Sequence, residues 1–191
     1  MPRIPNSRVL IVATDGFEEW ELFGPREILL KRGAEVVLAS PNRGPIQATV
    51  HDDPGKTIRP DLTVAEAEAE DFDALILPGG VRNPDHLRLN AQAIELIRDF
   101  ADQGKPIGAI CHAPWLLVEA DLLQDRTATS WPSIRTDLRN AGANVVDEAS
   151  VTDGNIVTSR KPQDVEAFTS AIIDLIEAAP EVTVIDEGAT V

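Results

Sequence analysis

The sequence predicts an α/β fold in which a doubly wound, mostly parallel sheet carries helices on both faces. Short apolar runs rich in β-branched residues recur along the chain, as expected of strands buried on both sides. Between them lie segments whose apolar residues recur at helical spacing. Strands that alternate with helices in this way form parallel sheets covered on both faces. The apolar runs are residues 8–13, 35–39, 73–77 and 105–110.

Composition narrows the class of protein. The chain has 191 residues, a net charge of −15 and a single cysteine. We find no internal repeat, low-complexity segment or linker, and predict one domain over residues 1–191 with a C-terminal tail at 180–191. The acidic charge disfavours nucleic acid and anionic membranes as partners. With one cysteine, no signal peptide and no membrane-length apolar run, we expect a cytoplasmic protein.

The first half of the chain predicts two strands separated by a helix. A strand over residues 8–13 leads to a helix over 17–32, which Gly33 ends. Pro25 lies within that helix and is expected to kink it or to mark a restart. A second strand follows at 35–39. Weaker elements are expected after it: a short strand at 46–50 and one or two helical turns at 64–70.

The second half continues the alternation. A strand at 73–77 is followed by a Pro-Gly-Gly sequence, and Asn90 is the expected N-cap of a helix over 91–103. A fourth strand over 105–110 leads to the cysteine. The remaining elements are helices at 113–120, 133–140 and 163–178, the last ended by Pro180, and a hairpin of strands 150–152 and 156–158 around Asp153-Gly154-Asn155.

Three loops with chemically active residues are expected to meet at one place. In doubly wound sheets, sites form in the crevice at the carboxyl ends of the strands. The loop 15–21 follows the first strand, Pro78-Gly79-Gly80 follows the third, and Cys111-His112 follows the fourth. Topology alone therefore predicts that these loops share a crevice.

Cys111 is the candidate nucleophile. It lies between an apolar run and a predicted helix, with the small residues Ala109 and Ala113 two positions away on either side. A nucleophile on a sharp strand-to-helix turn needs small neighbours, and the helix start would favour the thiolate. His112 follows at once and can approach the sulfur as acid, base or counter-ion. The alternative is that Cys111 is an inert buried thiol, the usual state of a lone cysteine.

The two other loops supply candidate partners. An N–H of Gly79-Gly80 together with that of His112 could form an oxyanion hole, although a plain tight turn explains the two glycines equally well. Glu18, Glu19 and Glu21 open the first helix, where the helix dipole favours carboxylates in any case. A carboxyl group beside the thiol would share a proton with it or rise in pKa.

Cofactor and metal motifs are not found in the sequence. Gly79-Gly80 lacks the spacing of a phosphate-binding loop for a dinucleotide or a nucleoside triphosphate. The three histidines show no paired ligand spacing. We therefore expect no cofactor and no metal site.

Five blocks of the chain resemble the PfpI family of intracellular cysteine hydrolases and deglycases, which belongs to the class I glutamine amidotransferase-like superfamily. The blocks cover most of the chain in the order typical of that family, and the Thr-Ser-Trp and Thr-Ser-Arg-Lys-Pro sequences are specific to it. The resemblance implies a flavodoxin-like sandwich with a nucleophile elbow. The blocks are residues 15–22, 77–80, 109–115, 129–142 and 157–162.

The resemblance also implies roles for individual residues. Cys111 corresponds to the nucleophile and His112 to its partner, with the amides of Gly80 and His112 as the oxyanion hole. Glu21 corresponds to the carboxyl group against the sulfur, and Glu18, one helical turn earlier, is assigned to substrate binding. Asp85 matches a third triad member that a neighbouring subunit supplies. The site would then need a homo-oligomer, a dimer or a hexamer.

Three functions follow from this resemblance. The first is a cofactor-independent, stress-protective enzyme of the glyoxalase or deglycase type, acting through Cys111 on reactive aldehydes such as methylglyoxal or on their adducts. The second is an intracellular cysteine peptidase with a triad of Cys111, His112 and Asp85 from the next subunit. The third, from another class, is a redox sensor or chaperone-like protein in which Cys111 is oxidised.

Overall fold

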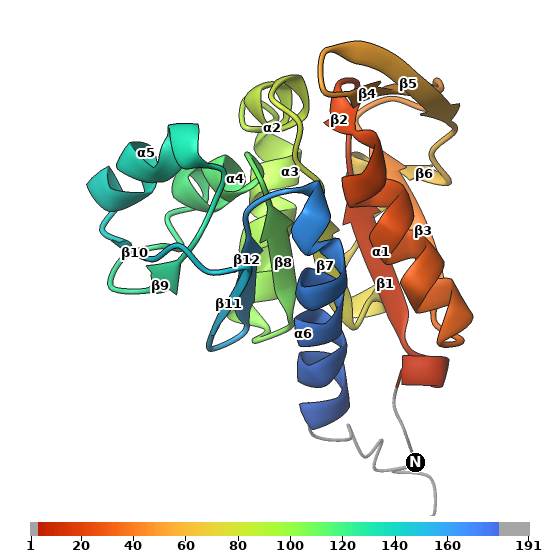
Figure 1. The fold of residues 1–191 in the computed structure, drawn as a ribbon. Helices are drawn as coiled ribbons and strands as arrows, with labels where there is room; N and C mark the ends of the chain where they lie inside the picture. The colour runs from red at the N-terminus through yellow and green to blue at the C-terminus, as the bar shows by residue number, and fades with distance from the viewer. Residues whose placement is uncertain (1–3, 180–191) are drawn as a thin grey trace, which may run out of the picture.

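A seven-stranded sheet forms the centre of the molecule. The computed structural model describes residues 4–179. Its main sheet has the order β11-β12-β8-β7-β1-β3-β6, and all neighbouring strands are parallel except β11 and β12 (Figure 1). The predicted fold class is confirmed. The strands are β1 (Arg8–Val12), β3 (Glu35–Ser40), β6 (Leu62–Thr63), β7 (Ala74–Leu77), β8 (Ile107–Ile110), β11 (Ser150–Asp153) and β12 (Ile156–Ser159).

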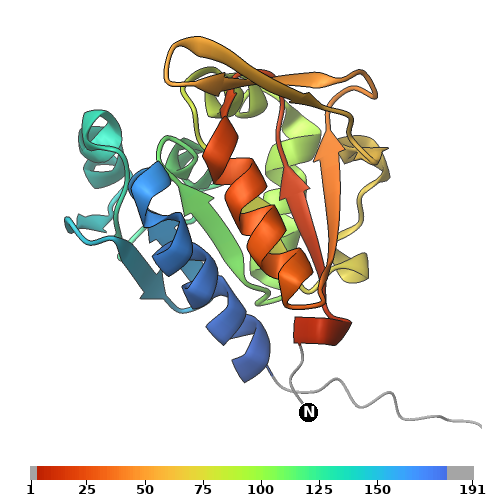
Figure 2. The same ribbon diagram turned by 45° about the vertical axis from the view of Figure 1, so that its right-hand side comes forward.

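Helices cover both faces of this sheet. Helices α1 (Glu19–Lys31) and α6 (Val165–Ala178) pack side by side on one face (Figure 2). The other face carries α3 (Ala91–Asp102) and α4 (Pro114–Glu119). Alternate residues of β1 point to opposite faces, so that Leu10 joins one apolar cluster and Ile11 the other. The remaining helices are α2 (Arg82–Leu87) and α5 (Arg135–Asn140).

Helix α1 begins later than predicted and continues past Pro25. Residues Phe17–Glu18 form the short strand β2, and the helix begins only at Glu19. The helix then runs through Pro25 without a restart. Gly24 and Pro25 are buried, and a side chain at position 24 would meet Val165 of α6. We infer that packing against α6 keeps the helix intact although Pro25 donates no hydrogen bond.

Two small sheets lie outside the main one. Strand β4 (Ile46–Val50) was predicted, and it pairs with β2 and with an unpredicted strand β5 (Asp53–Ile58). Strand β5 contains Pro54 and Gly55, residues that argue against a strand. Its pairing is supported by Glu19, whose Oε2 accepts a hydrogen bond from the Lys56 backbone N–H at 2.7 Å. The second sheet joins β9 (Thr127–Ala128) to β10 (Asn144–Val145) in parallel.

The other predictions hold with small shifts at the ends. The hairpin around Gly154 forms, and its second strand β12 lies parallel to β8. Two short 3-10 turns form where one or two helical turns were predicted at 64–70, and others precede α5 and α6. They are η1 (Ile4–Asn6), η2 (Val64–Glu66), η3 (Ala69–Asp71), η4 (Pro132–Ile134) and η5 (Pro162–Asp164). Pro180 and the predicted tail 180–191 lie outside the described residues. No helix within residues 4–179 is both long and apolar enough to cross a membrane.

Candidate active site

Cys111 lies on a sharp turn between β8 and α4, as predicted. Its φ of +64° is in the left-handed region, which costs a residue with a side chain about 1–2 kcal/mol. Backbone hydrogen bonds hold the turn: the Cys111 N–H donates to the carbonyl of Ser159 at 3.0 Å, and the Cys111 carbonyl accepts from Trp131 N–H at 2.9 Å. A strained backbone held in place by its surroundings is typical of functional residues.

The Pro78-Gly79-Gly80 loop lies directly against this turn. A Cβ atom on Gly79 would lie 2.6 Å from that of Cys111, so only glycine allows the approach. Gly80 has a φ of +78°. The Asn83 side chain holds the loop in place. Its Nδ2 donates to the Pro78 carbonyl at 2.7 Å, and its Oδ1 accepts from Thr14 N–H, also at 2.7 Å. The backbone amides of Gly80 and His112 donate toward the Cys111 sulfur, and both lower the pKa of the thiol.

Glu21 is the carboxyl group nearest the thiol. It is fully buried, and its Oε2 accepts a hydrogen bond from Gly79 N–H at 2.9 Å. Burial, and then the charge of Glu18, raise the pKa of Glu21 to about 8, although the Gly79 amide and the thiol act in the opposite direction. Glu21 therefore holds its proton at neutral pH.

Burial also has a larger effect than the following helix on the pKa of the Cys111 thiol. Loss of water, and then the Glu21 carboxylate, raise the pKa of the thiol above its ordinary value. The sequence argument expected the helix to favour the thiolate, but α4 has only six residues and begins with Pro114, which has no N–H to direct at the sulfur. Two buried acids in contact titrate as a pair, so one negative charge is shared between Glu21 and Cys111 when their first proton leaves.

His112 completes this arrangement. Its Nδ1 lies 3.2 Å from the Cys111 sulfur and its Nε2 lies 3.3 Å from Ser133 Oγ. The imidazole stacks on Trp131, with centroids 5.8 Å apart, and meets Trp115 at a tilt, at 5.5 Å. Burial lowers the pKa of His112 to about 4, so the ring is neutral at pH 7.

These residues line one cleft of about 750 Å³. It brings together five of the predicted site residues, Cys111, His112, Glu21, Gly80 and Glu18, and it does not include Asp85. Its further lining residues are His51, Asp52, Val81, Trp131, Ser133, Lys161, Pro162 and Gln163.

Asp85 lies apart from this cleft. It is exposed on α2, and within residues 4–179 the His112 ring makes its hydrogen-bond contacts with Cys111 and Ser133 and with no carboxylate. A contribution of Asp85 to a neighbouring subunit stays a prediction.

Glu18 holds the rim of the cleft. Its Oε2 accepts a hydrogen bond from the backbone N–H of His51 at 3.1 Å, and His51 lies in the turn between β4 and β5. Figure 1 shows the β4–β5 pair lying across the top of the molecule, above β2.

Within the described part of the chain, no group of three or more His, Cys, Asp or Glu side chains is arranged to hold a metal ion.

Comparison with known proteins identifies the family of this chain. A model of the DJ-1/PfpI family matches residues 7–175. The chain belongs to the DJ-1/PfpI family. A protein named as a deglycase from Pyrococcus abyssi is 42% identical over 170 residues, which cover 89% of this chain and 99% of the relative.

Solved structures of the DJ-1/PfpI family share the fold. Drosophila melanogaster DJ-1beta has a TM-score of 0.81 and 29% identity, and 91% of each chain is covered. A two-domain protein from Anabaena variabilis, with DJ-1/ThiJ/PfpI-like and ferritin-like domains, has a TM-score of 0.84 and 35% identity. That match covers 96% of this chain and 52% of the Anabaena chain, so this chain spans about half the length of that relative.

In this DJ-1/PfpI family member, sequence reasoning missed one wall of the cleft. Trp131, Ser133 and Lys161 lie in blocks that marked the resemblance, but no role was assigned to them. The topological rule that located the other loops also applies to β12, because its carboxyl end lies beside that of β8. Placing β12 next to β8 would have brought Lys161 to the crevice. The histidine contacts of Trp131 and Ser133 have no equivalent sequence pattern.

Proposed function

We propose that this protein is a cofactor-independent enzyme that acts on reactive 2-oxoaldehydes such as methylglyoxal, or on their adducts with proteins. The observation that carries the proposal is the contact of a strained cysteine with a protonated carboxyl group and two backbone amides in one cleft. The deglycase name of the Pyrococcus abyssi relative supports the same class of substrate.

The first step is addition of the thiol to the aldehyde. The Cys111 sulfur bonds to the aldehyde carbon while its proton passes to the Glu21 carboxylate in the singly ionised pair. The carbonyl oxygen becomes an oxyanion held by the N–H groups of Gly80 and His112 and then takes a proton from Glu21 to give a hemithioacetal.

The second step moves hydrogen between the two carbons. Glu21 or neutral His112 removes the proton from the former aldehyde carbon, and a proton is delivered to the adjacent carbon. The hydroxyl proton on the former aldehyde carbon passes to the oxygen of the adjacent carbonyl, so that the first carbon becomes the thioester carbonyl and the second carries the hydroxyl. The product is a thioester of a 2-hydroxy acid. Water hydrolyses this thioester and restores the thiol, so methylglyoxal and one water molecule give lactate without an external oxidant or reductant.

Peptide cleavage and cysteine oxidation remain alternative predictions. A peptidase triad would need Asp85 from another copy in a dimer or hexamer, and an Asp85→Ala variant would then lose peptide cleavage while keeping aldehyde chemistry. A redox role would need selective addition of oxygen to Cys111 by mild peroxide, which intact mass would detect.

The proposal is tested by measuring methylglyoxal loss and lactate formation with the wild-type protein and with Cys111→Ser. We expect lactate from the wild type and none above background from the variant, because a serine hydroxyl is a far weaker nucleophile than a thiol. Equal rates for the two proteins would overturn the proposal. A peptide substrate in parallel reactions separates the peptidase alternative.

A further inference from the structure

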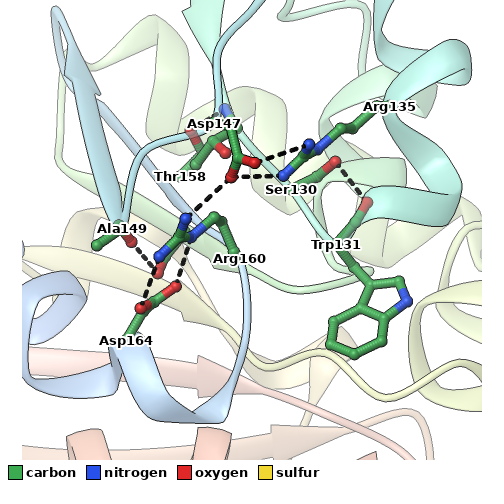
Figure 3. A network of polar contacts seen from close by, with 10 residues as sticks. Ser130, Trp131, Arg135, Asp147, Ala149, Thr158, Arg160 and Asp164 are labelled. Atoms are coloured by element: carbon green, nitrogen blue, oxygen red, sulfur yellow. Dashed lines mark hydrogen bonds and ion pairs between the residues drawn. The ribbon is translucent and has the colours of Figure 1, made fainter.

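Four charged side chains of alternating sign form a continuous chain of ion pairs beside the cleft (Figure 3). Asp147 accepts two hydrogen bonds from Arg135, at 2.7 Å to Oδ1 and 3.2 Å to Oδ2. Its Oδ1 also accepts one from Arg160 at 2.9 Å. Arg160 binds Asp164 through Nε at 2.8 Å and Nη2 at 3.2 Å. Bidentate pairs of arginine and carboxylate fix orientation as well as distance.

This ion-pair chain joins the two segments, around Ser133 and Lys161, that form one wall of the cleft. Arg135 comes two residues after Ser133, whose hydroxyl contacts His112. Arg160 directly precedes Lys161, which lines the cleft from the end of β12. Asp147 lies between the two arginines and is bonded to both.

The wall that carries Ser133 has both apolar and polar attachments. Ile134 and Leu138, which follow Ser133, are buried in the apolar core. Trp131 is bonded through its N–H to the Cys111 carbonyl, but the η4–α5 segment that follows lies to the side of the main sheet (Figure 1). On one side, Trp115 Nε1 of α4 donates to Asp137 of α5 at 2.8 Å. On the side of β12, the bond to Asp147 holds the start of α5. The segment is therefore anchored in the core by Ile134 and Leu138, and the two polar contacts add to this on either side.

The arrangement has a cost that its ion pairs must outweigh. Arg135 Nε is buried and has no hydrogen-bond partner among the described residues, a situation that is normally unfavourable. The Arg135 and Arg160 guanidinium groups lower the pKa of Asp147, with the hydrogen bonds from Arg135 as the largest cause. Asp147 is thus bound to both cations as a carboxylate at neutral pH.

We propose that Asp147 is a positioning residue for His112. Through Arg135 it holds the Trp131 ring and the Ser133 hydroxyl against the imidazole and keeps water away from it. This inference rests on the proposed function for its kinetic readout only, because the surroundings of His112 can be measured without a substrate.

The direction in which the pKa of His112 changes when Asp147 loses its charge distinguishes a positioning role from a direct electrostatic effect. The groups that face the imidazole are the Cys111 thiol, the Ser133 hydroxyl and two indole rings. The same cleft is also lined by titratable groups: Glu21, Glu18, Asp52, Lys161 and His51. Removing the negative charge of Asp147 would, through space, lower the pKa of His112 further. Admitting water to the ring would raise it, because burial is the cause of its low pKa.

The test is a proton NMR titration of His112 in the wild type and in Asp147→Asn, assigned by loss of the resonance in His112→Asn. We expect the pKa of His112 to rise from about 4 toward the ordinary 6.5 in Asp147→Asn. Asp147→Glu keeps the charge, so the pKa of His112 in this variant should lie closer to the wild-type value than in Asp147→Asn. Turnover of methylglyoxal should lose about tenfold in kcat in Asp147→Asn, with a smaller change in KM.

Glu35→Gln is the matched control. Glu35 and Asp147 side chains are equally exposed, at 61%, and Glu35 binds Arg8 at 2.9 Å at the other end of the strands. The control should leave the His112 pKa unchanged. An unchanged or lowered pKa in folded Asp147→Asn, or an equal rise in Glu35→Gln, would overturn the proposal.

A second variant covers the case in which Asp147→Asn does not fold. Arg135→Lys keeps the charge and removes the bidentate geometry, so it should also raise the pKa of His112. If it does not, the proposal is wrong. If the wild type does not convert methylglyoxal, the proposed function fails while the NMR result still decides the role of Asp147.

Discussion

The two walls of the cleft are held by different forces. On the side of Cys111 and the Pro78–Gly80 loop, buried backbone hydrogen bonds and close backbone contact fix the geometry. On the side of Trp131 and Ser133, the Trp131 backbone bond and buried apolar side chains are joined by a partly exposed series of arginine–aspartate pairs. We therefore expect the first wall to change only when the backbone or its nearest atoms are altered, and the second to respond also to the loss of the Asp147 charge.

The largest effect is expected from a change in the first wall. In Gly80→Ala, the new Cβ would lie 2.8 Å from the Glu18 nitrogen, and the φ of +78° is unfavourable for alanine. The Gly80 amide would move from the sulfur. We expect kcat for methylglyoxal to fall by about 10²–10³, as when one oxyanion donor is lost.

Gly104→Ala is the control for this prediction. Gly104 has a φ of +65°, and a Cβ atom at this position would meet none of the described residues within 4 Å. The variant therefore experiences the backbone strain without the clash. It should lose some stability and keep its activity. Equal activity losses in the two variants would mean that strain, and not the amide position, is responsible.

A smaller effect is expected on stability from Glu21→Gln. The folded protein keeps the Glu21 proton up to about pH 8, whereas the unfolded chain loses it near pH 4.5, so wild-type stability falls as the pH rises between these values. Glutamine does not titrate, so this loss is absent in the variant. The free energy of unfolding of Glu21→Gln relative to the wild type should therefore increase by about 3 kcal/mol from pH 4 to pH 7. Urea unfolding across this pH range measures it.

His112 contributes the opposite slope. Its pKa is lowered from 6.5 to about 4, so the unfolded chain binds the proton between these values and stability rises with pH there. In the wild type the two slopes offset each other between about pH 4.5 and 6.5. In Glu21→Gln only the contribution of His112 should remain, so the stability of that variant should rise with pH in this range. A stability that falls with pH in the variant would contradict this assignment.

The smallest kinetic effect is expected from the second wall. The tenfold loss of kcat in Asp147→Asn should be well below that of Gly80→Ala, because the wall supports His112 without contacting the reacting carbon. If the two variants lost activity equally, the distinction between the walls would fail.

The first wall could be predicted from the sequence and the second could not. The strand order brings Cys111, Gly80 and Glu21 to one edge, and short apolar runs reveal those strands. The contact between Ser133 and His112 depends on how η4 and α5 pack on the rest of the molecule. The side-chain pairs of this segment with Asp147 are not revealed by any periodicity. Strand β5 was missed for a similar reason, since pairing with β4 overrides Pro54.

The protonation of the site was also beyond sequence reasoning. The order of the strands predicted that the loop with Glu18, Glu19 and Glu21 would lie near Cys111. The family resemblance implied Glu21 in particular, and Glu21 is the carboxyl group nearest the thiol. Whether the helix or the loss of water decides the pKa of the thiol depends on burial depth, and burial prevails here.

The most direct test of the shared proton is the pH dependence of lactate formation from methylglyoxal in the wild type and in Glu21→Gln, with Cys111→Ser as the blank. The wild-type kcat/KM should rise with pH through about 8, where the Glu21–Cys111 pair loses its first proton. In Glu21→Gln that rise should be absent at pH 8 and should occur only at a higher pH. The same rise at the same pH in both proteins would contradict the account.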